Sequence, residues 1–364
     1  MKIGILTYHR SHNYGALLQA VATRYILQST GHEVYYADYF PSYHKRVYKM
    51  FSWHNFIAKS GVRGKLYYLY NTIKEYPYKK ERYKNFESFI KKEIEPYSRS
   101  ANEKYDIMVY GSDQIWRIQK ATGDFNSVYF GDNMIQAQRR ISYAASMGNI
   151  NLTEQKRNEL KLLLNNFDSI SVREESLKKL VESLGFTNVS LVIDPTLLLN
   201  SNDWDAILPH RIVLKKKYVL LYDLWKGSFN MGAVKNFASE NDLELIEITG
   251  SAHKKGDYFY RPTASPYEFV DLIRNADFVF TSSFHGLVFS LLFNRQFYAS
   301  FKKNADRAFS LLSILGIEER MIEVGAQKIP QKKEIDYVEV NEYIADYRKA
   351  SLKYLLENCK YLRS

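Results

Sequence analysis

The sequence predicts an α/β protein built from two doubly wound, Rossmann-like domains. With 364 residues the chain is too long for one ordinary core and suits two domains of about 150 residues each. Its content of 46% hydrophobic and 25% charged residues is typical of a soluble globular protein. Short apolar stretches that end in polar or glycine residues alternate with helical stretches, as expected for parallel sheets covered by helices.

The first half of the chain opens with a strand, a helix and a second strand. Residues 2–8 form a short apolar strand, residues 15–29 a helix that Gly31 stops, and residues 32–37 the next strand. The alternation resumes further on, with strands predicted at 106–110, 140–145, 169–172 and 190–193 and helices at 153–165 and 174–184. We expect residues 1–205 to form an N-terminal α/β domain, with residues 41–105 as an insertion in it.

The second half repeats the same alternation after a boundary expected near residues 199–216. Strands are predicted at 218–222, 244–248, 278–281 and 296–299, and helices at 232–240, 266–275 and 284–294. We expect residues 206–335 to form a C-terminal α/β domain. Residues 336–364 are predicted to form a terminal helix that packs back on the N-terminal domain.

Positive charge is concentrated in the insertion. Of the net charge of +11, the stretch 41–105 contributes 15 Lys/Arg against 6 Asp/Glu, together with 15 aromatic residues that are mostly tyrosines. Such a patch suits an anionic bilayer surface or an acidic glycan. The alternative is a solvated pair of helices whose tyrosines pack inward. No zinc-finger, RNP-type or homeodomain pattern accompanies the charge, so we expect no nucleic acid partner.

The remaining bulk features favour a cytoplasmic protein. No run of about 18 apolar residues exists, and the first residues resemble a β-strand rather than a signal peptide. The single cysteine, Cys359, excludes an internal disulfide and a cysteine-based metal cluster. We expect a cytoplasmic location, with peripheral contact between the insertion and the anionic inner face of the plasma membrane.

In sheets of this type function resides at the carboxyl ends of strands, and the stretch TSSFHG (281–286) is the strongest candidate. A strand runs into Ser282 and Ser283, and a helix begins at about Phe284. The first turn of a helix presents unpaired N–H groups, which favour an anion. His285 could hold a phosphate or carboxylate, or donate a proton near neutral pH. Alternatively, Ser283 only caps the helix and His285 fills a polar niche.

Arg173 ends another apolar strand, in SISVREES. A buried arginine there needs an anionic partner, which is either a ligand carboxylate or phosphate or a neighbouring acidic residue such as Glu174, Glu175 or Asp194. For Asp194, which precedes Pro195, a structural role such as orienting Arg173 or closing the domain junction is favoured, and substrate binding is the alternative.

Two further strand ends carry polar residues. After the first strand, Asn13 either caps the following helix or contacts a ligand, and Gly15 permits a close approach of a ligand or backbone. Asp113, in YGSDQIW, could accept a hydrogen bond from a sugar hydroxyl or act as a base. The phosphate loop, the dinucleotide fingerprint, HExxH, GxSxG and the kinase motifs are all missing from the sequence, which disfavours the common hydrolases, kinases and nicotinamide enzymes.

Six stretches of the sequence, taken together, resemble the polysaccharide pyruvyl transferase family. They are HNYGALLQA (12–20), YGSDQIW (110–116), SYAASMG (142–148), SVREES (171–176), VIDPTLLL (192–199) and TSSFHGLVFSLLFNRQFYA (281–299), and they occur in family order over about 290 residues. Residues 41–105 and those beyond about 330 match no family motif.

The resemblance implies a fold similar to the glycosyltransferase B type, with the active site between the domains. It implies phosphoenolpyruvate as donor, on the side of the C-terminal domain. As acceptor, on the side of the insertion 41–105, it implies a hexose of a surface polysaccharide or its lipid-linked precursor. It places Arg173 and His285 in donor binding or catalysis, Phe284 beside the donor, and Asn13, Gly15 and Asp113 near the cleft. We therefore expect His285 as general acid, Asp113 as base, and Arg173 with Ser282 and Ser283 on the donor. No metal or organic cofactor is implied.

Two other functions compete with this prediction. A nucleotide-sugar-dependent glycosyltransferase can have the same fold, and function depends on the site rather than on the fold. A non-catalytic protein that binds glycans or a membrane surface would explain the basic aromatic insertion. It would not explain the joint presence of Asn13, Asp113, Arg173 and His285.

Overall fold

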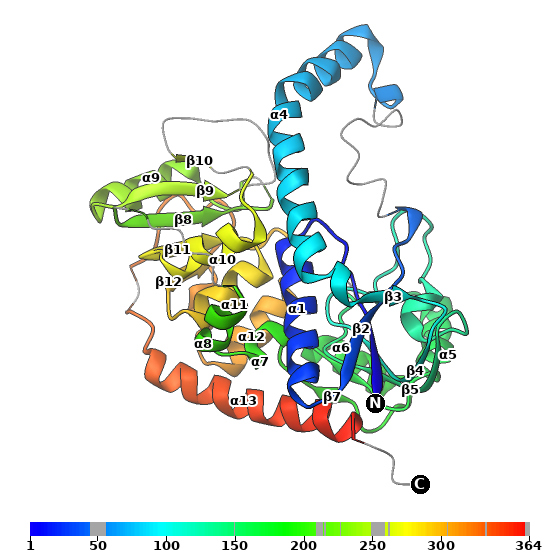
Figure 1. The fold of residues 1–364 in the computed structure, drawn as a ribbon. Coiled ribbons are helices and arrows are strands. Elements are labelled where there is room, and N and C mark those ends of the chain that lie inside the picture. The colour runs from blue at the N-terminus through cyan, green and yellow to red at the C-terminus, as the bar shows by residue number, and fades with distance from the viewer. Residues whose placement is uncertain are drawn as a thin grey trace.

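The computed structural model contains two five-stranded sheets, each wound in the same way (Figure 1). It describes residues 1–43, 56–148, 150–208, 214, 216–225, 227–248, 259–260, 263–303, 305–331 and 333–360. The first sheet has the strand order β3-β2-β1-β4-β5 and the second the order β10-β9-β8-β11-β12, and all paired strands are parallel. The predicted fold class, two doubly wound Rossmann-like domains, is confirmed.

The first sheet contains the strands β1 (Lys2–Leu6), β2 (Glu33–Asp38), β3 (Ser98–Ser100), β4 (Lys104–Tyr110) and β5 (Gln136–Ser142). Its helical elements are α1 (Tyr14–Ser29), α4 (Gly61–Glu93), η1 (Glu95–Tyr97), η2 (Ser127–Phe130), α5 (Glu154–Leu164) and α6 (Glu175–Ser183). The short strands β6 (Ser171–Val172) and β7 (Ser190–Leu191) pair with each other and continue the sheet through isolated bridges. The buried faces of β1 and β4 supply much of its core.

The second sheet contains β8 (Tyr218–Tyr222), β9 (Glu244–Ile248), β10 (Phe259–Tyr260), β11 (Phe278–Thr281) and β12 (Gln296–Ala299). Its helices are α9 (Met231–Glu240), α10 (Pro266–Arg274), α11 (Phe284–Leu292), α12 (Asp306–Ile314) and the short η3 (Glu318–Arg320). Strands β8, β9, β11 and β12 have the predicted bounds, and every predicted helix in this half is present within about two residues.

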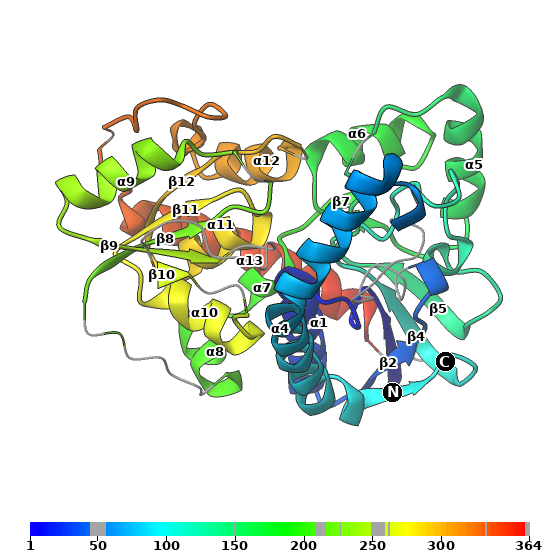
Figure 2. The same ribbon diagram turned by 90° about the horizontal axis from the view of Figure 1, so that it is seen from above.

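Three short or terminal helices connect the two halves. Helices α7 (Pro195–Leu198) and α8 (Ser201–Ile207) lie in the connecting region, and α13 (Tyr337–Asn358) closes the chain. Figure 2 shows α13 passing beneath both halves. Its Ser351 accepts a hydrogen bond from the backbone N–H of Ile193 (2.9 Å), and Arg348 donates to the carbonyl of Leu197 (2.7 Å). The limits of 205 and 335 for the two domains stay predictions.

The insertion differs from the pair of helices with inward tyrosines that composition allowed. Residues 61–93 form one helix, α4, with Pro77 inside it. Five of its tyrosines are exposed to solvent, namely Tyr67, Tyr70, Tyr76, Tyr78 and Tyr83. The inward-packing interpretation is therefore wrong for these tyrosines of α4, because only the last third of the helix reaches the core, whereas Tyr105 near the end of the insertion is buried. The remaining residues of the insertion, 44–55, lie outside the described residues.

Within the described part of the chain, none of the helices combines the length and apolar character needed to span a bilayer.

Candidate functional site

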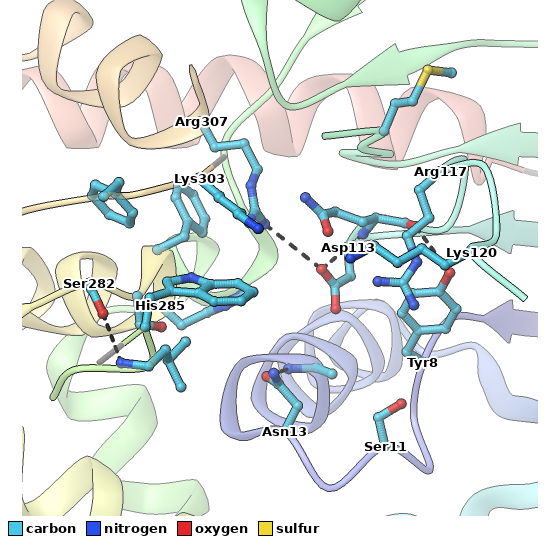
Figure 3. A pocket seen from close by; sticks show the side chains of 18 of the residues that line it. Tyr8, Ser11, Asn13, Asp113, Arg117, Lys120, Ser282, His285, Lys303 and Arg307 are labelled. Carbon is cyan, nitrogen blue, oxygen red and sulfur yellow. Dashed lines mark hydrogen bonds and ion pairs between the residues drawn. The ribbon is translucent and has the colours of Figure 1, made fainter. Parts of the chain in front are cut away.

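Four strand ends converge on one cavity between the two sheets. The cavity has a volume of about 670 Å³ and is lined by residues that follow β1, β4, β8 and β11 (Figure 3). In each sheet these are the two adjacent strands at which the winding reverses, between β1 and β4 and between β8 and β11. Ligands of doubly wound folds bind at such switch points, outside the carboxyl ends of the strands. The topology alone therefore places a binding site here.

The serines at the start of α11 build the wall of this cavity. Ser283 accepts a hydrogen bond from the N–H of Gly286 (3.4 Å) and so caps the helix, which was the structural alternative for this residue. The Ser282 hydroxyl donates to Asp223 (2.8 Å) and accepts from the N–H of Leu224 (2.8 Å). Both hydroxyls line the cavity, but their hydrogen bonds hold the helix and the loop after β8.

His285 extends into the cavity from α11, and its imidazole packs against the first turn of α1. A Cβ atom added to Gly15 would lie 1.9 Å from its Nδ1 atom, so only glycine leaves space for the imidazole there. The close approach expected at Gly15 is thus to a side chain of the other domain. The Nε2 atom of His285 lies 3.6 Å from a carboxylate oxygen of Asp194. An anionic Asp194 would stabilise positive charge that develops on the ring.

Arg173 lies behind the cavity wall rather than in it. Its side chain is only 2% exposed and pairs with Asp194 through an Nη1–Oδ2 contact of 2.5 Å. The guanidinium also lies 4.7 Å from the centroid of the Phe284 ring. Burial alone would lower the pKa of Arg173, but the nearby carboxylates of Asp194, Glu174 and Asp113 raise it. The ion pair to Asp194, one of the alternatives that the sequence left open, is therefore present.

Asp194 is a buried structural residue. Its carboxylate accepts hydrogen bonds from the N–H (3.0 Å) and hydroxyl (2.6 Å) of Thr196 and caps α7. Burial works to raise the pKa of Asp194, but the charges of His285 and Arg173 and the hydrogen bond from the Thr196 hydroxyl hold it well below its usual range. Asp194 does not line the cavity, so its place in the structure matches the structural role favoured from the sequence.

Asp113 and Asn13 both face the cavity. Asp113 has a φ of 75° and presents its carboxylate between the guanidinium groups of Arg173 (3.8 Å) and Arg307 (3.9 Å). Burial raises the pKa of Asp113, but the charges of Arg173, His285 and Arg307 outweigh it, so the pKa lies below its ordinary value. Asn13 caps α1 by accepting from the N–H of Ala16 (3.2 Å) and also lines the cavity.

Sequence reasoning missed Arg307, whose guanidinium, unlike that of Arg173, faces the cavity. Arg307 is the second residue of α12, and its guanidinium lies 5.3 Å from the Phe284 ring and 4.0 Å from a carboxylate oxygen of Glu174. Burial, and then the repulsion of Arg173, lower its pKa to about 10, which leaves it protonated at neutral pH. The sequence did contain a signal for Arg307, because the stretch FKKNADRAFS, like the other candidate stretches, joins the end of a strand to the start of a helix.

Sequence reasoning also missed two other residues of the cavity walls, Lys303 and Trp225. Lys303 and Trp225 line the second domain's side, with the Lys303 ammonium 5.8 Å from the Trp225 ring. Trp225 is 41% exposed, on the loop that Asp223 and Ser282 hold. Behind Arg307, the buried Glu174 accepts a hydrogen bond from Ser146, and burial raises its pKa.

The cavity is strongly cationic. Among the described residues that line it, Arg117, Lys120, Lys303 and Arg307 carry positive charge, and Asp113 is the only carboxylate. This arrangement suits an anionic ligand with more than one charged group. The described residues contain no group of three or more His, Cys, Asp or Glu side chains that could hold a metal ion.

Comparisons with known proteins give a family and a set of structural neighbours. The family described as polysaccharide pyruvyl transferase matches residues 13–299. Among curated protein sequences no match to this chain is found.

Structural neighbours include two UDP-GlcNAc 2-epimerases and a glycosyltransferase. The epimerase from Neisseria meningitidis bound to UDP-GlcNAc is 10% identical, with 98% of this chain and 99% of that chain covered and a TM-score of 0.48. The epimerase from Methanocaldococcus jannaschii has 10% identity, coverage of 95% and 92%, and a TM-score of 0.47. The glycosyltransferase SnogD from Streptomyces nogalater has 10% identity, coverage of 98% and 99%, and a TM-score of 0.47.

Proposed function

The chain belongs to the polysaccharide pyruvyl transferase family, and we propose that it transfers pyruvate from phosphoenolpyruvate to a hexose. The hexose is part of a cell-surface polysaccharide or its lipid-linked precursor, and phosphate is released. The observation that carries this proposal is the cationic cavity at the paired switch points, with His285 and Arg307 on one wall and Asp113 facing them. No organic cofactor or metal is needed for the reaction.

The donor is proposed to bind against the second domain. Arg307 and Lys303 supply two positive charges there, and the first turn of α11 adds backbone N–H groups. Phosphoenolpyruvate carries a carboxylate and a phosphate, so two cationic side chains match its two anionic groups. Arg307 thereby takes the direct contact that the sequence assigned to Arg173. Arg173 is proposed as a positioning residue that holds Asp113, Asp194 and the Phe284 ring.

The reaction adds two hydroxyl groups of one sugar to the same carbon of the donor. One hydroxyl attacks the carbon that bears the phosphate while the methylene carbon gains a proton and becomes a methyl group. The carbon–oxygen bond to phosphate then breaks, and the second hydroxyl closes the ketal ring. The sugar loses two hydroxyl protons in all. One replaces the proton that is added to the methylene carbon, and the other leaves with phosphate.

His285 is proposed as the general acid for the methylene carbon, or as the group that stabilises the leaving phosphate. Its neighbour Asp194 would stabilise positive charge on the ring, since the two lie 3.6 Å apart. Asp113 is proposed as the base for the attacking hydroxyl. Its low pKa makes it a weak base while Arg173 and Arg307 face it. A bound anionic donor would offset those charges and raise the basicity of Asp113 when the acceptor is present.

The acceptor is proposed to bind against the first domain, with Trp225 as a platform at the mouth of the cavity. Tyr8, Asn13 and Gln114 on that wall offer polar groups to a sugar, and Trp225 offers an exposed aromatic face. Arg117 and Lys120 on the same wall favour an acceptor with its own negative charge, such as a sugar attached to phosphate.

Incubation with phosphoenolpyruvate and a panel of sugar acceptors tests this function. We expect phosphate release only with an acceptor, and an acceptor mass that rises by one pyruvate less one water. His285→Ala should reduce turnover by about 100-fold or more. The matched control His32→Ala, which directly precedes the first residue of β2 and does not line the cavity, should leave turnover unchanged. Thermal stabilisation by nucleotide-sugars and none by phosphoenolpyruvate would instead support a glycosyltransferase.

A further inference from the structure

Helix α4 has two halves with different surroundings. Its second half is anchored to the body of the protein through Phe86, Phe89 and Ile90, which are buried. Glu87 lies 2.7 Å from His12 on the first domain, and the Asn85 amide donates to the carbonyl of Thr263 on the second (2.7 Å). These contacts fix the direction of the helix, and its first half projects away from both domains (Figure 1).

The projecting half carries an apolar stripe that faces solvent. Val62, Leu66 and Ile73 are 75%, 60% and 73% exposed, and Tyr76 is exposed as well. Their spacing of four, seven and three residues places them on one side of an α-helix. Exposed aliphatic side chains cost little one by one, but an aligned stripe of them on a projecting helix indicates a binding surface.

Positive charge borders this stripe. Residues 56–80 contain six Lys and Arg but a single acidic residue, Glu75, which pairs with Lys79 (2.9 Å). Helical geometry places Lys65 on one flank of the stripe and Arg63 and Lys74 on the other. Tyr70 is exposed next to it, and tyrosine is enriched where a protein meets the boundary between lipid and water.

We propose that this face of α4 docks on an anionic lipid bilayer. An apolar stripe flanked by lysine and arginine, with tyrosine at its margins, is the pattern of helices that lie in the bilayer interface. The aliphatic side chains enter the acyl boundary, and the flanking cations contact anionic headgroups. A second copy of the chain would bring two strongly positive helices together, and a nucleic acid would leave the aliphatic stripe in water.

Docking would hold the catalytic cavity close to the lipid surface. His12, which contacts Glu87 of α4, lies between Ser11 and Asn13, and both of these line the cavity. A substrate with a lipid tail would then reach the cavity along the membrane surface. The docking itself does not depend on the proposed pyruvyl transfer, since none of the stripe residues lines the cavity.

Flotation of the purified full-length chain with lipid vesicles tests the proposal. We expect it to float with vesicles of phosphatidylcholine and phosphatidylglycerol, to float at least tenfold less with phosphatidylcholine alone, and to dissociate as salt is raised. The double variant Leu66→Asp/Ile73→Asp should lose at least tenfold of the bound fraction. The control Leu162→Asp/Val338→Asp changes aliphatic residues that are 71% and 73% exposed elsewhere, and should bind like the wild type.

The outcomes separate the possibilities. Equal flotation of the wild type and Leu66→Asp/Ile73→Asp would overturn the proposal, as would the absence of flotation with either vesicle. A dimer in solution that the double variant dissociates would assign the stripe to a second copy of the chain. Phosphate release with soluble acceptors should be the same in both double variants, so a failure of the proposed reaction would be recognised independently of lipid binding.

Discussion

At the scale of single residues, the site is organised around one aromatic ring between two guanidinium groups. Arg173 and Arg307 both lie within 5.3 Å of the centroid of Phe284, and Asp113 faces both arginines. Two like charges this close need anionic partners, which Asp194, Glu174 and Asp113 supply. Only Arg307 also reaches the cavity. A bound anion would therefore add a partner mainly to Arg307.

Replacement of Arg307 should weaken donor binding selectively. We expect Arg307→Ala to raise the KM for phosphoenolpyruvate by roughly 10- to 100-fold, because a charge-assisted hydrogen bond contributes about 1.5–3 kcal/mol. Arg307→Lys should recover part of the loss, since it keeps the charge but not the planar fork. The measurement is steady-state phosphate release at varied donor concentration.

The control for this substitution is Arg157→Ala on α5, which lies at the surface and outside the cavity lining and should leave the KM unchanged. An Arg307→Ala enzyme with an unaltered donor KM would contradict the direct contact and return that role to Arg173.

Sequence reasoning found the residues at strand ends but not the direction in which they point. Arg173 and Asp194 were both selected because they end buried strands, yet both side chains lie behind the wall. Whether a side chain turns into a cavity or under it depends on packing with the other domain, which no local pattern encodes. The same applies to Gly15, whose neighbour His285 is distant in sequence.

At the scale of elements, the strands and short helices were predictable because each combines apolar residues that become buried with polar or glycine residues at its ends. The bounds of β8, β9, β11 and β12 agree with the predicted ones. Helix α4 was not predictable as one continuous helix, since Pro77 lies inside it and its first half lacks a buried face. The proline removes one donor, and the carbonyl of Ile73 that loses this partner sits in an exposed stretch that water can reach.

Helix α13 should contribute to stability through one buried hydroxyl. Ser351 is 1% exposed and accepts a hydrogen bond from the N–H of Ile193 (2.9 Å). Ser351→Ala would leave that N–H without a partner, which costs about 1–3 kcal/mol. Denaturant unfolding should show this loss. The variant Lys353→Ala, on the exposed face of the same helix, should change the free energy of unfolding by less than about 0.5 kcal/mol.

A Ser351→Ala protein as stable as the wild type would mean that water replaces the hydroxyl at Ile193, and that other contacts of α13, such as the hydrogen bond from Arg348 to Leu197, hold the helix in place.

At the scale of the whole molecule, the two domains meet through an aromatic cluster as well as through the cavity. Tyr14 of α1 stacks on Phe269 of α10 with centroids 4.4 Å apart, and its hydroxyl donates to the carbonyl of Ala264 (2.6 Å). Tyr222 completes the cluster from β8. The cavity is therefore part of an interface with its own core, and the arginines and carboxylates inside it contribute to the stability of the whole chain.

Acid should destabilise the protein partly through this site. The folded-state pKa of Asp113 lies below its ordinary value of 3.8, so the unfolded chain binds a proton first as pH falls. The stabilisation is thus complete well above pH 3.8 and is lost as pH falls toward the lower folded pKa, with a slope of up to about 1.4 kcal/mol per pH unit. The free energy of unfolding, measured from pH 7 to pH 3, should show this decline.

Asp113→Asn should flatten that part of the curve, whereas Asp346→Asn, at an exposed position of α13, should not. An Asp113→Asn protein that loses stability with the wild-type slope would show that other carboxylates account for the acid sensitivity.

The contact between His285 and Gly15 also has an evolutionary consequence. The imidazole of one domain occupies the space that a side chain at position 15 would fill. Among descendants of such a protein, position 15 should remain glycine as long as position 285 remains histidine. A lineage in which the histidine is lost would be free to vary at both positions. The two should therefore change together, which would mark the members in which the proposed role of His285 has been lost.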